Sequence, residues 1–172
     1  MLLWLCMLCL IPFNLSSMDS TLLPSPAPAP APAPQETQCG LVQGIIRVCK
    51  EHLVEAGPTR EAACACLSAL LTRPDMETAI LSDFMSWACA HLEGWGGKGG
   101  AAEHELTRES FRLIGILHTI SQIFKKGHRS NVLPFASRAL RPCLVLTQQA
   151  NQTLVRKLLI KVVALWLCGH RE

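Results

Sequence analysis

The chain has 172 residues, of which 49% are apolar and 17% charged, and a net charge of +3. This length suits one compact domain or a few repeat units, and the apolar content allows a large core. Tyrosine is absent and phenylalanine occurs only five times, which favours aliphatic packing between helices over a β-sandwich. The charge is uneven, because residues 1–100 carry five Lys/Arg and nine Asp/Glu, whereas residues 101–172 carry eleven and four. The second part therefore indicates an acidic partner, with an ordinary solvated helical face as the alternative.

The chain opens with "MLLWLCMLCLIPFNLSS", an uncharged apolar run stopped by Pro12. The run is too short to span a bilayer, which needs about 20 apolar residues. One interpretation makes Met1–Ser17 the signal peptide of a secreted, cytokine-like helical protein, with glycosylation sequons at Asn14 and Asn151. Against it, no Lys or Arg precedes the run and the cleavage site is poor. The other interpretation is a buried helix, and these residues alone leave both open.

We divide the first half into a helix at 1–12, a Pro/Ala-rich linker at 13–38 and helical repeats at 39–93. Alternating Pro and Ala between Pro24 and Pro34 predict an extended spacer. Helical periodicity then predicts three helices, the first stopped by Gly57 and Pro58, the next two capped by Thr59 and Asp75. The stripes predicted to face inward are Leu41, Val42, Ile45, Ile46, Cys49 and Leu53, then Ala63, Cys66, Leu67, Leu70 and Leu71, then Leu81, Phe84, Met85, Ala88 and Leu92.

The second half consists of a Gly-rich loop at 94–104, helical repeats at 105–166 and a tail at 167–172. The loop lacks the arrangement of a phosphate-binding loop. A long helix should end at Gly127 after Lys125 and Lys126, and a short helix should end before Pro142. The inward stripes are Phe111, Ile114, Leu117, Ser121 and Phe124, widened by Leu113, Ile116 and Ile120, and in the last helix Leu154, Leu158, Val162 and Leu165.

Seven helices without a competing strand pattern predict an all-α fold. Helix pairs that recur at around 40 residues favour a HEAT/armadillo-like α-solenoid, with a globular bundle as the alternative. No catalytic motif is present, so we expect no enzymatic activity and no cofactor. The nine cysteines are not spaced for a zinc site, and "CMLC" at Cys6–Cys9 has no adjacent charge to lower a thiol pKa.

Five segments in the same order carry a resemblance to the tubulin-specific chaperone D family, also called tubulin-folding cofactor D or beta-tubulin cofactor D. The segments are "LLWLCMLCLIPFNLSSMDSTLL", "REAACACLSALLTRPDM", "LSDFMSWACAHL", "ISQIFKKGHRSNVLPFASRAL" and "NQTLVRKLLIKVV". They resemble a helix running into "LIPF", a helix ending in Thr-Arg-Pro-Asp, a Phe-x-x-Trp helix, a Gln-Ile-Phe-Lys-x-Gly turn and an Asn-Gln-Thr-Leu helix. The Pro/Ala tract, "GWGGKGG" and the tail depart from the family pattern.

The resemblance implies a partial product from the amino-terminal part of a HEAT/armadillo-repeat protein. It implies a chaperone that binds beta-tubulin after chaperonin release, assists assembly with alpha-tubulin and activates tubulin's GTPase within the cofactor complex. The implied partners are beta-tubulin, the other tubulin-folding cofactors and an Arf-like small GTPase, with no nucleic acid and no membrane insertion. The implied location is cytoplasmic and microtubule-associated, with lateral cell junctions. The opening run would then be a repeat helix that packs against a preceding helix.

Because tubulin is acidic, the resemblance agrees with the positive charge of the second half. A basic face of the repeats could attract such a partner electrostatically. We expect the tubulin-binding surface to contain six basic residues, Lys125, Lys126, Arg129, Arg156, Lys157 and Lys161.

Overall fold

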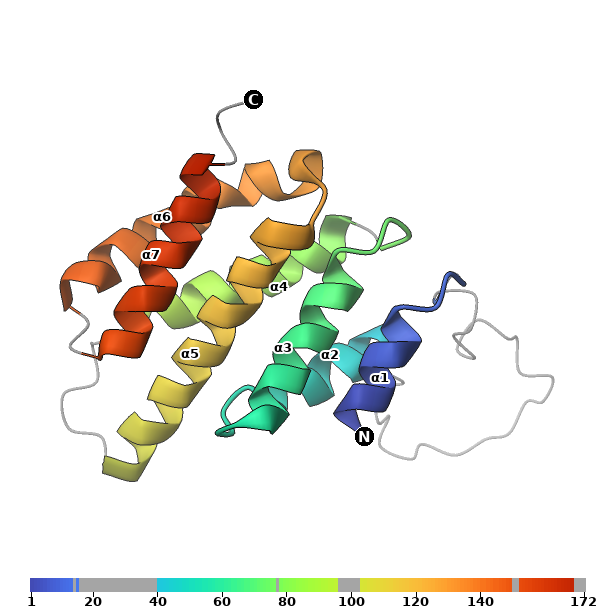
Figure 1. Cartoon of the computed structure of the whole chain (residues 1–172), viewed down its shortest axis with the longest axis horizontal. Coiled ribbons are helices and arrows are strands. Elements are labelled where there is room, and N and C mark those ends of the chain that lie inside the picture. Colours follow the sequence, from blue (N-terminus) through green and yellow to red (C-terminus); the bar gives the residue numbers. More distant parts are fainter. Residues whose placement is uncertain (14, 16–39, 77, 96–102, 150–151, 169–172) are drawn as a thin grey trace, which may run out of the picture.

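The computed structural model describes residues 1–13, 15, 40–76, 78–95, 103–149 and 152–168. These residues form seven helices and no strand (Figure 1). The helices are α1 Leu2–Cys9, α2 Leu41–His52, α3 Pro58–Leu71, α4 Thr78–Glu93, α5 Glu103–Lys126, α6 Arg129–Gln149 and α7 Thr153–Cys168.

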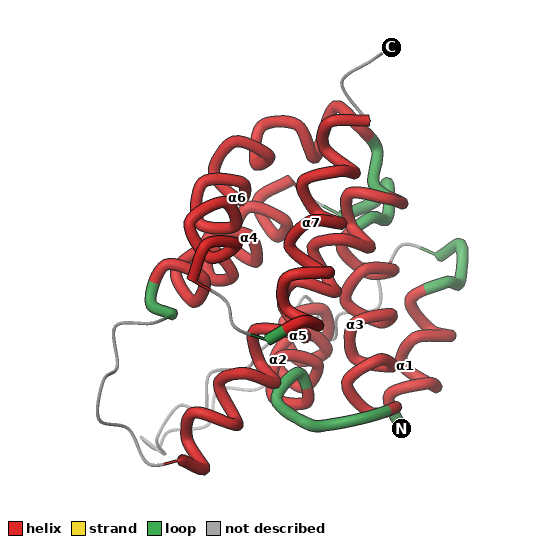
Figure 2. The backbone as a smooth tube through the Cα atoms, turned by 60° about the vertical axis from the view of Figure 1, so that its left-hand side comes forward, coloured by secondary structure: helices red, strands yellow, loops and turns green. Residues whose placement is uncertain are grey.

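The helices stack in two layers, and their order alternates between them. Helices α1, α3, α5 and α7 lie side by side, so that α3 packs between α1 and α5, and α5 between α3 and α7 (Figures 1 and 2). In the other layer α4 packs against α6, while α2 packs against α3. Most helices therefore pack against the helix two positions further along the chain, as the stacked repeats of an α-solenoid do. The predicted fold class is confirmed.

The core consists of the apolar stripes that helical periodicity predicts. In α2 to α5 almost every residue of the predicted stripes is buried, and the exceptions are half-exposed Leu41 and the partly buried Phe111 and Phe124. The fully buried Phe84, Leu117 and Ile120 show how the two layers share a single core. Burying such a side chain contributes about 1.5–3 kcal/mol.

The helix starts differ from two of the predicted caps. Helix α3 begins at Pro58, and proline suits this position because it has no backbone N–H that would need a partner. The residue before it is Gly57, whose φ is 79°. Thr59 thus lies inside the helix and does not cap it. Asp75 is also not a cap, because α4 begins only at Thr78 and the Asp75 carboxylate pairs with Arg73.

Helix α6 continues through two prolines, and the prediction that it ends before Pro142 is wrong. Pro134 and Pro142 both lie inside the helix. Each removes one backbone hydrogen bond, which normally ends or bends a helix. The helix nevertheless continues, because it packs against α4 on one side and α7 on the other, and the buried Cys143 and Leu146 lie beyond the second proline. Tertiary packing overrides local propensity here.

The predicted inward face of helix α7 is confirmed only in part, since Val162 is buried and Leu158 packs against the core. Its buried residues are Val155, Leu159 and Val162, whereas Leu154 is 50% exposed. Leu158 and Leu165 are partly buried. Because apolar residues occur all round this helix, periodicity does not select one face, and the contacts with α5 and α6 decide it.

Helix α1 is held by Arg73, from the Thr-Arg-Pro-Asp segment. One terminal nitrogen of its guanidinium donates to the carbonyl oxygens of Cys9 and Ile11 at 2.6 and 2.7 Å, and the other to that of Phe13 at 2.6 Å. Asp75 accepts two further hydrogen bonds at 2.7 and 2.8 Å. The carbonyls at a helix end lack partners within the helix, so Arg73 satisfies them and fixes α1 to the end of α3.

Helix α1 packs against α3, and its expected contact with a preceding helix stays a prediction. Leu2 and Cys9 are buried where α1 packs against α3, while the opposite face exposes Leu3, Trp4 and Met7. Among the described helices, none combines the length and the apolar character that crossing a membrane would require.

Several predicted features fall on residues that lie outside the described ranges. These include the sequon asparagines Asn14 and Asn151, most of the Pro/Ala-rich linker and the centre of the Gly-rich loop. Where the structure can be compared, α5 begins at Glu103 inside the predicted loop, and α7 extends to Cys168 inside the predicted tail.

Candidate functional site

The six predicted basic residues form two groups. Lys125 and Lys126 end α5 and Arg129 begins α6, so these three, which we call the turn cations, surround a single connection. Arg156, Lys157 and Lys161 lie in the first half of α7, and we call them the α7 cations. All six side chains are exposed.

The two groups are displaced along the layer. Helices α5 and α7 run side by side in the same direction (Figure 1), and Trp166 of α7 lies level with Phe124 of α5 in one cavity. Arg156 is ten residues before Trp166, a distance of roughly 15 Å at about 1.5 Å per residue. The structure therefore does not bring the six residues into one cluster.

One lysine of each group acts electrostatically on His118 of α5. Burial lowers the pKa of its imidazole, and the positive charges of Lys161 and Lys126 lower that pKa further.

The α5–α6 connection is tight because of Gly127. Its backbone N–H donates to the Ile123 carbonyl at 2.7 Å, closing α5. A Cβ atom at this position would lie 2.7 Å from that carbonyl oxygen and 2.7 Å from Cγ2 of Val132. Only glycine fits without a shift of the backbone, and the lack of a side chain lets α6 start directly after the turn.

Acidic residues are scarce in the sequence around the six predicted cations. From Ser110 to Arg171 the sequence contains ten Lys or Arg and no Asp or Glu. Accordingly, none of the six predicted cations forms an ion pair with any residue that the structure describes. Such a surface attracts anionic partners over about a Debye length, roughly 8 Å at physiological salt.

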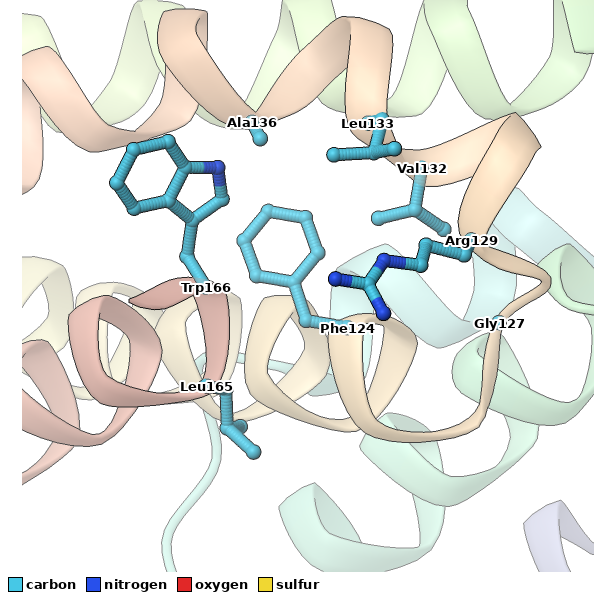
Figure 3. Close-up of a pocket in the computed structure, with 8 residues that line it drawn as sticks. All are labelled: Phe124, Gly127, Arg129, Val132, Leu133, Ala136, Leu165 and Trp166. Atoms are coloured by element: carbon cyan, nitrogen blue, oxygen red, sulfur yellow. The ribbon is translucent and has the colours of Figure 1, made fainter. Parts of the chain in front are cut away.

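A cavity of about 220 Å³ lies beside the turn cations, between the end of α5, the start of α6 and the last turns of α7. In Figure 3, Trp166, Phe124 and Arg129 follow one another along one side of the hollow, and Val132, Leu133 and Ala136 of α6 line the other. The cavity is thus largely apolar with a single charged group, the Arg129 guanidinium, at one end.

A second cavity, of about 570 Å³, lies on the other side of the same turn. Gly127, Arg129 and Val132 line both cavities, and Lys126 and His128 add further basic groups to the second. The turn therefore borders two hollows, and the second combines apolar side chains with several basic ones.

The sequence analysis did not identify a third basic region, the groove of about 550 Å³ between α2, α4 and α5. It is lined by Arg47, Lys50, Arg108 and Arg112. The Lys50 ammonium lies 4.5 Å from the centre of the Trp87 ring, and burial lowers the pKa of this amine. The spacings Arg47–Lys50 and Arg108–Arg112 place each pair on one helix face. This spacing is the sequence signal that could have identified the groove.

The cysteines lie mainly in the α1–α3 region, and the seven whose side chains the structure describes are free thiols. Cys9 and Cys66 approach with their sulfur atoms 3.8 Å apart, and burial and the neighbouring thiols raise the pKa of both. A raised thiol pKa makes these groups poor nucleophiles at neutral pH. No group of three or more potential metal ligands occurs among the described residues.

Comparison with known families identifies the family of the chain. The model of the family described as tubulin-specific chaperone D-like, ARM repeat, matches residues 1–92, just over half of the chain. The chain belongs to this family. No solved structure matches the chain.

The tubulin-specific chaperone D-like match covers α1 to α3 and almost all of α4, and it includes the contact of Arg73 with α1. The turn cations and the α7 cations lie beyond the matched residues. Helices α5 and α7 nevertheless continue the layer that α1 and α3 begin. The candidate site is therefore carried by the continuation of the same stack.

Proposed function

We propose that this chain acts in tubulin folding: it binds beta-tubulin after release from the chaperonin and assists its assembly with alpha-tubulin. The observation that carries the proposal is the stretch from Ser110 to Arg171, with ten cations and no acidic residue, on a repeat stack of the tubulin-specific chaperone D-like family. Exposed cations without partners favour association with an acidic protein and steer it toward the surface.

The proposal extends to the other members of the pathway. The chain would work together with the other tubulin-folding cofactors and bind an Arf-like small GTPase. Within the cofactor complex it would act as a GTPase activator for tubulin, supplying no catalytic residue of its own. Its place in the cell would be the cytoplasm, at microtubules and at lateral cell junctions.

We favour this function over that of a secreted cytokine-like protein. The segment that a signal peptide would occupy contains α1, whose Leu2 and Cys9 are buried against α3. Arg73 holds the end of this helix with three hydrogen bonds to backbone carbonyls. These contacts support a helix of the repeat stack.

A tubulin pulldown with the full chain tests the proposal. Two charge-reversal variants separate the groups, one with Lys125, Lys126 and Arg129 changed to Glu, the other with Arg156, Lys157 and Lys161 changed to Glu. We expect each to weaken binding about tenfold or more and to reduce its dependence on salt. Arg141→Glu, at an exposed cation of α6 outside both groups, is the control. Unchanged binding of both variants would contradict the proposal.

A further inference from the structure

The cavity beside the turn cations has the size and chemistry to take one large apolar side chain. Its volume of about 220 Å³ exceeds the roughly 150 Å³ of a protein cavity that accepts benzene. Two aromatic rings, from Phe124 and Trp166, and the aliphatic side chains of Val132 and Leu133 line it (Figure 3). Leu133 is 40% exposed, so an incoming apolar group would remove apolar surface from water.

The rim of this cavity is positively charged. Arg129 lines the cavity and also the larger hollow across the turn, where Lys126 and His128 join it. None of the three has a carboxylate partner among the described residues. An apolar group that enters the cavity would therefore carry anionic neighbours on the side of Arg129.

We propose that the cavity recognises a protein segment in which a leucine-sized or phenylalanine-sized side chain is flanked by carboxylates. The apolar side chain fills the hollow between Phe124, Leu133 and Trp166, and a neighbouring carboxylate accepts hydrogen bonds from the Arg129 guanidinium. The inference rests on the proposed function, because both use Arg129. It adds selectivity that the charges alone do not provide, since the cavity would prefer acidic segments that carry a fitting apolar side chain.

The shape of the surface favours an extended segment as the occupant. The two cavities meet at Gly127 and Arg129, so a chain can cross the turn and use both. Charge attraction alone discriminates poorly between acidic sequences, whereas an apolar pocket adds about tenfold or more for each well-fitted side chain. The combination accounts for an apolar cavity within the most basic part of the chain.

The test uses the full chain and two labelled peptides, blocked at both ends. One carries a central leucine between two pairs of glutamates, and the other carries alanine in its place. Fluorescence polarisation at physiological salt should show the leucine peptide binding about tenfold more tightly. Arg129→Glu should weaken it about tenfold, and Leu133→Glu should remove the preference for leucine. Both altered side chains are exposed, and helical circular dichroism verifies the fold.

The matched control is Arg141→Glu, an exposed cation of the same helix away from the cavity, which should change binding less than twofold or so. Equal affinity for the two peptides, equal effects of the Arg129 and Arg141 variants, or no binding at millimolar peptide would overturn the inference. The inference would also be overturned if a thymidine oligonucleotide bound more tightly than the leucine peptide and lost this binding in the Leu133→Glu variant.

A tubulin pulldown in parallel separates this inference from the proposed function. Selective peptide binding without tubulin binding retains the cavity and rejects tubulin as the partner. Tubulin binding that is unaffected by Leu133→Glu, together with equal peptide affinities, retains the function and rejects the cavity.

Discussion

The two ends of the stack use charged residues in opposite ways. At the α1–α3 end, Arg73 is nearly buried and makes five hydrogen bonds, three of which join the connection after α3 to the end of α1, while the outer surface of α1 is apolar and uncharged. At the α5–α7 end the cations are exposed and make no ion pair among the described residues. At one end of the stack, the hydrogen-bonded charge of Arg73 stabilises the helix packing. At the other end, the charges of the six predicted cations have no such partner among the described residues. The free charges are the ones available to a partner.

The largest effect should follow from removing the fixed charge. Arg73→Ala leaves three backbone carbonyls and the Asp75 carboxylate without their donor. We expect a loss of about 3–4 kcal/mol in the free energy of unfolding, measured by urea denaturation. Hydrogen exchange should show that the amides of α1 lose protection first.

The control for this variant is Arg60→Ala. Arg60 donates one hydrogen bond of 3.4 Å to the Glu55 carbonyl, and its loss should cost less than about 1 kcal/mol. If the two variants were equally stable, Arg73 would not be the residue that holds α1, and the contrast between the two ends would fail.

Substitutions of two glycines test the contact between the end of α2 and α5, which connects the two ends of the stack. A Cβ atom on Gly115 of α5 would lie 2.8 Å from the Leu53 carbonyl oxygen, so Gly115→Ala should destabilise the chain by about 2 kcal/mol. Gly44 of α2 has no atom within 4 Å of its Cβ position. Gly44→Ala should therefore stabilise by about 0.5–1 kcal/mol, as expected in an open helix position. Thermal unfolding of both variants measures the difference in sign, and the same sign in both would show that α5 does not rest on the end of α2.

The sequence predicted the helices of this stack better than their ends and faces. Amphipathic periodicity identified the buried side of α2, where Val42, Ile45 and Cys49 are inward, because polar residues occupy the rest of that helix. In α7 the same reasoning selected Leu154 instead of Val155, since apolar residues surround the helix and only its neighbours determine which face is covered.

Contacts between distant residues were the part that the sequence could not provide. Asp75 is the residue type of a helix cap at a cap-like position, yet it pairs with Arg73, whose other partners lie 60 to 64 residues earlier. For the candidate site, the sequence identified the basic residues individually. It did not reveal that Arg129 adjoins a cavity completed by Trp166, because that cavity exists only where three helices meet.

The pH dependence of the free energy of unfolding shows whether the two ends of the stack unfold together or separately. The neighbouring Cys49 thiol and burial raise the pKa of Cys66 in α3 to about 12, and burial raises the pKa of Cys143 in α6 to about 12. In the unfolded chain both thiols titrate near about 8.5. Between these values the unfolded state releases protons that the folded state retains. Stability should therefore be unaffected below pH 8 and fall above about pH 8.5, by up to about 1.4 kcal/mol per pH unit for each thiol.

Two variants assign this slope to the ends of the stack. Cys66→Ala and Cys143→Ala should each flatten the alkaline slope by a similar amount if the chain unfolds as one unit, whatever each substitution does to stability at pH 7. A slope changed only by Cys143→Ala would mean that the measured transition is that of the α5–α7 end alone. The measurement is urea unfolding from pH 7 to pH 10.5.

The smallest effect compares a cation that has a partner with one that has none. The Lys50 ammonium lies over the Trp87 ring at 4.5 Å and the Phe84 ring at 5.8 Å, and such a contact contributes about 0.5–1 kcal/mol. Lys50→Gln should lose about that much stability, whereas Lys125→Gln, at an exposed position at the end of α5, should lose no more than about 0.3 kcal/mol from the helix dipole.

The order of the two effects should reverse for tubulin binding, where Lys125→Gln should have the larger effect, because Lys125 is unpaired and belongs to the turn cations. Thermal unfolding and the tubulin pulldown, carried out on the same two variants, would show whether a cation that stabilises the fold and a cation that binds a partner are different residues. A Lys125 variant that destabilised the chain as much as the Lys50 variant would mean that the charges at the α5–α7 end are structural as well.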